Sequence, residues 1–119
     1  NDAVELVNFA LKNSKKFAGK IVCADMKSAL ILDVLKTWIK RYGGGYKVIK
    51  GRKGDRLDEY LIGNNEINHT FKIRKKNKTY YVIDYNKNSS KPIKKIISSQ
   101  NSKKLNENEL SELLKIGMK

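Results

Sequence analysis

Apolar residues recur with a helical period in three stretches, within residues 3–12, 29–42 and 106–119. The apolar stripes are, in order, Val4, Val7, Ala10 and Leu11; Leu30, Ile31, Val34, Leu35, Trp38 and Ile39; and Leu110, Leu113 and Leu114. Each stretch has at or just before its start a residue that can cap a helix, and these residues are Asp2, Ser28, and Asn106 or Asn108. The pattern predicts three amphipathic helices, of which the second ends at a run of three glycines.

Shorter apolar runs between these helices follow other patterns. Residues 20–24 (KIVCA) predict a buried strand, and residues 46–50 (YKVIK) alternate as a second strand would. Residues 57–62 (LDEYLI) have the spacing of a short helix. Residues 68–76 and 79–86 predict a hairpin around a Lys-Asn-Lys turn, with Tyr80 and Val82 on one face and Tyr81 and Ile83 on the other.

The order of these elements predicts an α/β fold, or an α+β fold for the chain in isolation, with a small sheet and flanking helices. Its first part has βαβ character, but the glycine pattern of a dinucleotide-binding sheet is absent from the sequence. We expect residues 1–119 to form a single domain that belongs to a longer protein. Residues 86–104 are rich in Lys, Ser and Asn and predict an extended arm with the composition of a mobile segment.

The charge is strongly positive: 26 Lys and Arg against 12 Asp and Glu give a net charge of +14. Such a field attracts any polyanion without identifying it, and many of these lysines are also typical of a solvated surface. The sequence contains no signal peptide, no long apolar run and no lipidation motif. A cytoplasmic chain without a membrane partner is therefore the expectation.

Few residues offer catalytic chemistry. His69 is the only histidine, and its strand-like context favours a surface or packing role over that of a general base. Cys23 is the only cysteine, which excludes an internal disulfide, and its apolar neighbours favour a buried, inert thiol. Metal ligands are few and scattered. We expect no catalytic residue and no metal site within this chain.

The turn GRKGD at residues 51–55 is the best candidate for a binding site. Gly51 and Gly54 permit backbone conformations closed to other residues, and they let main-chain amides approach a ligand. Arg52 offers a fork of donors to a diphosphate, and Asp55 can accept bonds from sugar hydroxyls. A helix starting at Leu57 would add its positive end. The alternative is an ordinary turn in which Asp55 only caps that helix.

Three motifs that follow one another along the chain support a binding role for the turn: NDAVELVNFAL, IVCADMKSALILDVL and VIKGRKGDRLDE. Their order and spacing resemble the C-terminal part of the extended short-chain dehydrogenase/reductases that act as UDP-N-acetylglucosamine 4,6-dehydratases and 5-epimerases in bacterial capsule and polysaccharide synthesis. The ending SSQNSKKLNENELSELLK is similar to that of the same group. The resemblance implies the substrate-binding C-terminal lobe of a Rossmann-type enzyme.

By this resemblance, Arg52 would contact the UDP diphosphate and Asp55 would bind the ribose, with Gly51 and Gly54 shaping the turn. The NADP expected for the family would bind upstream of this chain, so we expect no cofactor here. The family's Tyr-x-x-x-Lys pair is also outside it, because the pair with that spacing here, Tyr46 and Lys50, falls in a predicted strand. The complete enzyme would form a homo-oligomer.

Several positions depart from the family pattern, among them Ala24, Asp25, Lys50 and Asp58, and residues 64–100 match little of it. A second interpretation is therefore a nucleic-acid-binding module. In that case the hairpin would stack bases on Tyr80 and Tyr81, and its cations would neutralise phosphates. Those cations are Lys72, Arg74, Lys75 and Lys76.

Overall fold

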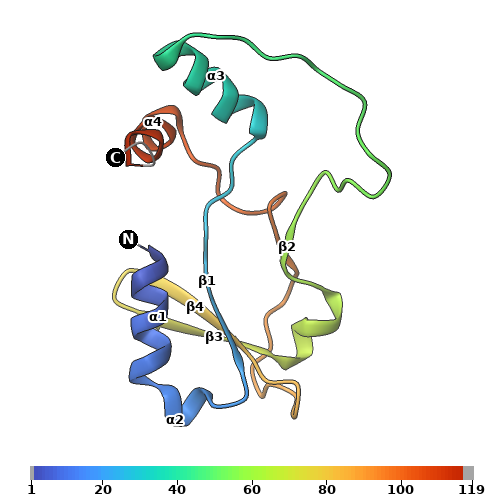
Figure 1. The fold of residues 1–119 in the computed structure, drawn as a ribbon. Coiled ribbons are helices and arrows are strands. Elements are labelled where there is room, and N and C mark those ends of the chain that lie inside the picture. The colour runs from blue at the N-terminus through green and yellow to red at the C-terminus, as the bar shows by residue number, and fades with distance from the viewer. Residues whose placement is uncertain (1, 117–119) are drawn as a thin grey trace. The chain divides into compact units, whose positions relative to one another are not determined.

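The computed structural model describes residues 2–116, which divide into two compact units (Figure 1). The first unit combines the chain up to residue 26 with residues 60–98, and the second combines residues 27–59 with the chain after residue 98. The predicted mixed α/β class, with a small sheet and flanking helices, is confirmed. The sheets are antiparallel throughout, so the predicted βαβ character is wrong. The single domain stays a prediction.

The first unit is built on a three-stranded sheet of order β1-β4-β3. The strands are β1 (Ile21–Ala24), β3 (Thr70–Lys75) and β4 (Lys78–Ile83). The predicted hairpin is therefore confirmed, with Lys72 opposite Tyr81 in its register. Its turn contains Lys76 at a φ of 53°, a left-handed backbone that short turns use.

Both faces of this sheet are covered. Phe9 of α1 (Asp2–Lys12) and Phe17 of α2 (Ser14–Phe17) pack on Tyr80 and Val82 of β4. On the opposite face, Tyr81 and Ile83 pack with Cys23 and with Ile62. The predicted division of β4 between two faces is confirmed, but each of its last four residues is buried.

Ile62 belongs to β2 (Tyr60–Ile62), which pairs with β5 (Ile97–Ser98) in a second, two-stranded sheet. The helix predicted over residues 57–62 is therefore wrong, because the backbone of residues 60–62 pairs with a strand distant in sequence. The 3-10 helix η1 (Asn64–His69) follows β2 and leads into β3. The arm predicted at 86–104 holds no helix, but its Ile93 and Ile97 pack on the core.

The apolar stripe predicted for α1 does not face the sheet. Val4, Val7 and Leu11 are exposed, whereas Phe9 is buried and Leu6 packs beside it. The helix has two apolar faces, and the face that bears the aromatic ring buries more apolar area against the sheet.

The second unit contains α3 (Ile31–Tyr42) and α4 (Glu107–Ile116). Gly43 ends α3 as predicted, with a φ of 76° and its N–H bonded to Ile39. The predicted cap of α3 is wrong, because the Ser28 hydroxyl donates to the Ser99 carbonyl instead. Leu30, which precedes α3, and Ile31 and Trp38 within it are exposed, so only part of the predicted apolar face is covered.

Asn106 caps α4 as predicted. Its side-chain oxygen accepts a hydrogen bond from the Glu109 N–H at 2.9 Å, and Glu109 accepts one from the Asn106 N–H at 3.0 Å. This reciprocal pair is a capping box. The strand predicted at 46–50 is absent: residues 43–52 have no regular structure, and their side chains are exposed.

A buried carboxylate follows β4. Asp84 is 4% exposed, its Oδ2 lies 3.2 Å from the Lys20 ammonium, and its Oδ1 accepts a hydrogen bond from the Asn86 N–H. Burial acts to raise the pKa of Asp84, but these partners outweigh it and lower that pKa below its ordinary value of 3.8. A carboxylate with a lowered folded-state pKa stabilises the protein above its unfolded-state pKa, and the contribution is lost as pH falls.

We therefore predict that Asp84→Asn lowers the urea midpoint at pH 7, and that its difference from the parent shrinks as pH falls from 5 to 2.5. Urea unfolding followed by circular dichroism at several pH values measures this. Asp25→Asn is the matched control, because Asp25 is exposed in the same unit. If the urea midpoint of Asp84→Asn stays below that of the parent by the same amount at every pH, the stabilisation does not come from the ionised Asp84 carboxylate and the prediction is contradicted.

Candidate functional site

The candidate turn at residues 51–55 is present and closed by its own residues. The Asp55 Oδ2 accepts a hydrogen bond from the Arg52 N–H at 2.7 Å, and the Asp55 N–H donates to the Arg52 carbonyl at 3.1 Å. Gly54 has a φ of 94°, which a side chain at this position would strain. Gly51 lies beside the Asp55 carboxylate. All five residues are exposed.

Arg52 and Asp55 thus have different roles in the turn. Within residues 2–116, the Arg52 guanidinium forms no hydrogen bond or ion pair, so its donors can bind an external anion. One oxygen of Asp55 instead holds the turn closed. No helix follows at Leu57, which is fully exposed, so the predicted helix end beside the anion is wrong.

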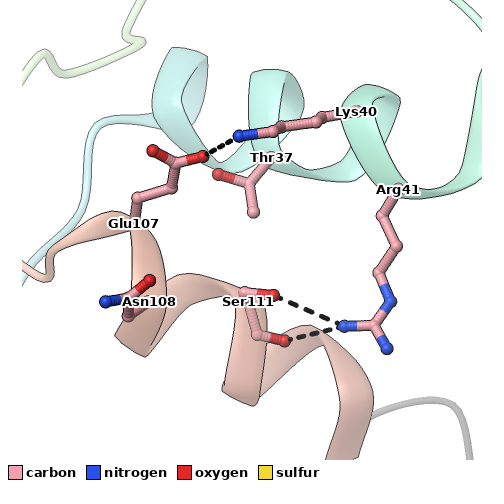
Figure 2. Close-up of a pocket in the computed structure, with 6 residues that line it drawn as sticks. All are labelled: Thr37, Lys40, Arg41, Glu107, Asn108 and Ser111. Atoms are coloured by element: carbon pink, nitrogen blue, oxygen red, sulfur yellow. Dashed lines mark hydrogen bonds and ion pairs between the residues drawn. The ribbon is translucent and has the colours of Figure 1, made fainter.

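Three hollows in the part of the surface that residues 2–116 form are lined by residues other than those of this turn. One of about 340 Å³ lies between α3 and α4, and Figure 2 shows the residues that line it. Lys40 and Glu107 form an ion pair at 2.6 Å, which raises the pKa of Lys40 and lowers that of Glu107. Arg41 donates to the carbonyl and hydroxyl of Ser111. The Lys40–Glu107 ion pair and the hydrogen bonds from Arg41 to Ser111 cross the hollow and connect α3 to α4.

Two adjoining hollows of about 740 and 310 Å³ flank β3 in the first unit and share Lys72 and Lys91. We call them together the basic groove. Its cationic residues are Lys72, Arg74, Lys87, Lys91, Lys94 and Lys95. Among the described residues 2–116, no acidic residue lines either hollow.

The sequence indicated Lys72 and Arg74 as cations of the hairpin, but not the four lysines of the following segment. Those lysines lie in the predicted arm, and only the contact of that arm with β3 brings them to the hairpin. A local signal does exist, because Pro92 and Ile93 interrupt the polar run where the chain returns to the core. The predicted stacking of bases on Tyr80 and Tyr81 finds little open ring surface, because the two residues are 5% and 4% exposed.

The reactive side chains are placed as expected for structural roles. Cys23 is buried in the core, and burial, together with Glu66, raises the pKa of its thiol. The His69 ring lies beside Tyr85, with its Nδ1 3.0 Å from the Lys87 carbonyl oxygen. Residues 2–116 contain no group of three or more potential metal ligands. In the same range, each helix is too short or too polar to cross a lipid bilayer.

Comparison with protein-family models gives no match, and no curated protein matches the sequence at a significant level. The resemblance to nucleotide-sugar enzymes therefore stays a prediction from the sequence motifs.

Proposed function

We propose that this chain is the UDP-sugar-binding C-terminal part of a nucleotide-sugar 4,6-dehydratase/5-epimerase of the UDP-N-acetylglucosamine type, which serves surface polysaccharide synthesis. The observation that carries the proposal is the turn at residues 51–55, in which Asp55 closes the backbone and leaves the Arg52 guanidinium without a partner in the described chain. A guanidinium fork on a fixed turn matches the paired phosphates of UDP.

The chemistry assigned to this chain is binding and orientation. In the complete enzyme, an NADP-binding Rossmann lobe would supply oxidation at C4, loss of water across C5 and C6, and return of the hydride. Arg52 would hold the diphosphate, at a distance from the reacting carbons. Binding energy from a remote part of the substrate can position the reacting sugar and so raise the rate.

Asp55 would act on Arg52 as a positioning residue. Its Oδ2 is used by the Arg52 N–H, and this bond fixes the backbone from which the guanidinium extends. A further bond from Asp55 to the ribose stays a prediction. Gly54 supports the same geometry, since its positive φ excludes most other residues.

The test measures the binding of UDP to the 119-residue chain by ligand-observed NMR, with a titration that gives the Kd. Arg52→Ala is expected to raise the Kd for UDP at least about tenfold, because a hydrogen bond to a charged group contributes about 1.5–3 kcal/mol. Arg52→Lys keeps the charge but loses the fork, and an intermediate Kd is expected.

Lys53→Ala is the matched control, because it removes one exposed charge from the same turn. It should change the Kd for UDP less than twofold. Equal losses in the two alanine variants would assign the effect to net charge and contradict the proposal. Absence of UDP binding to the parent chain would contradict it as well.

A further inference from the structure

The basic groove concentrates positive charge that is only partly balanced by nearby acidic groups, because Lys87 alone of its six cations acts on a neighbouring carboxylate, that of Asp84. All six cations are exposed, and within residues 2–116 none of them forms an ion pair. Other exposed lysines, such as Lys15 and Lys36, are also without an ion pair within residues 2–116, but the groove differs in gathering six cations around adjoining hollows. Like charges gathered with little counter-charge repel one another and create a strong local positive potential. An anionic ligand would relieve that repulsion.

The fold holds these cations in place on both sides of the groove. On β3, Lys72 and Arg74 alternate with Phe71 and Ile73, which pack on the core with Phe9. Successive side chains of a strand point to opposite faces, so the two cations project away from that core.

The other side of the groove, residues 87–95, is tied to the same strand. Pro92 forms a β-bridge with Phe71, and the Ile93 N–H donates to the Thr70 carbonyl at 3.3 Å. Ile93 also packs against the buried core. The lysines of this segment therefore extend from an anchored backbone.

We propose that the basic groove binds the phosphate backbone of single-stranded nucleic acid without reading its sequence. Five of its six cations are lysines, whose ammonium groups act as point charges toward phosphate and lack the planar fork that reads guanine. Tyr81 lines the smaller hollow but is only 4% exposed, and Tyr80 is 5% exposed, so neither ring offers bases an open stacking platform.

The concave shape selects among polyanions. Reading a duplex requires a convex helix or ribbon inside a DNA groove, whereas a positively charged groove follows the backbone of a single strand. A membrane would offer anionic headgroups over a surface, and it would not require a hollow. The basic groove and the turn at residues 51–55 share no residue, so an experiment can contradict the proposal for one site and leave the proposal for the other intact.

The test uses the full 119-residue chain and a fluorescent single-stranded DNA 20-mer of mixed sequence. Fluorescence anisotropy is recorded from 50 to 300 mM salt for the parent, for Lys72→Gln/Lys91→Gln/Lys94→Gln, and for a control, Lys15→Gln/Lys36→Gln/Lys47→Gln. Each triple variant removes three exposed charges, but the control lysines do not line the groove. Thermal unfolding of all three proteins checks that they are folded.

The groove variant is expected to bind at least tenfold more weakly at 50 mM salt. Its slope of log K against log salt should fall by about 2, because each neutralised phosphate of a single strand contributes about 0.7. The control should keep the parent's slope. Parent affinities for mixed-sequence and oligo-dT strands should agree within about threefold, because the proposed contacts involve only the backbone.

Three results would overturn the proposal. The first is equal weakening of both triple variants, which would assign binding to net charge. The second is absence of DNA binding to the parent at 50 mM salt. The third is a groove variant that keeps DNA affinity but loses binding to phosphatidylserine vesicles, which would assign the groove to a membrane surface.

Discussion

Replacing Phe9 with alanine should lower the free energy of unfolding by about 3–5 kcal/mol, the usual cost of removing a buried aromatic side chain. Phe9 is 6% exposed and stacks on Tyr80, with ring centroids 3.9 Å apart and planes 14° apart. Phe17 contacts it from the side at 5.5 Å. The substitution removes one ring from a cluster of three and leaves a cavity between α1 and the sheet. Urea unfolding at pH 7, followed by circular dichroism, measures the loss.

Val7→Ala is the control on the same helix. Val7 is 56% exposed, so its truncation should change the free energy of unfolding by less than about 0.5 kcal/mol. The stripe predicted from sequence would give Val7 a buried role. A cost for Val7→Ala as large as that for Phe9→Ala would contradict the observed orientation of α1.

The sequence predicts an element well when local signals are sufficient. The hairpin of β3 and β4 combines alternation, β-branched and aromatic residues and a short polar turn, and these signals agree. Likewise, α4 has its apolar stripe and its capping asparagine. For α1 the helix itself is predicted correctly and only its orientation is wrong, because periodicity detects both apolar faces and the packing partner selects between them.

The elements that failed depend on contacts distant in sequence. Residues 46–50 alternate like a strand, yet within residues 2–116 no strand pairs with them, and their exposed backbone forms no regular structure. Ser28 precedes α3 as a cap would, but its hydroxyl bonds to Ser99 and its backbone pairs with Lys104. No local pattern specifies such partners.

The two candidate sites differ in the same way. The turn at residues 51–55 is encoded by adjacent residues, because its glycines and the Asp55 side chain act within five positions. Its geometry could therefore be predicted from sequence. The basic groove combines a strand with a segment that follows the next strand, so Lys72 and Lys91 meet only in the folded unit. The composition shows that the chain has an excess of positive charge, but only the fold shows that part of this charge gathers in the basic groove.

Ile62→Ala should also destabilise strongly, by about 2–5 kcal/mol. Ile62 is fully buried against Cys23, Tyr81 and Ile83, on the face of the sheet opposite α1. Its backbone pairs with Ile97 of β5, next to a shift in register between Tyr60 and Ile62. Truncation would leave a cavity that a paired strand cannot easily collapse to fill.

Leu57→Ala is the matched control because both residues belong to the segment predicted as one helix. In a helix over residues 57–62, Leu57 and Leu61 would share an apolar face, and truncating Leu57 would cost stability. In the observed structure Leu57 is fully exposed, so the change should be within about 0.5 kcal/mol. Urea midpoints of the two variants distinguish these structures. If Leu57→Ala lowers the free energy of unfolding and Ile62→Ala leaves it unchanged, the result would favour the predicted helix over residues 57–62 and contradict β2.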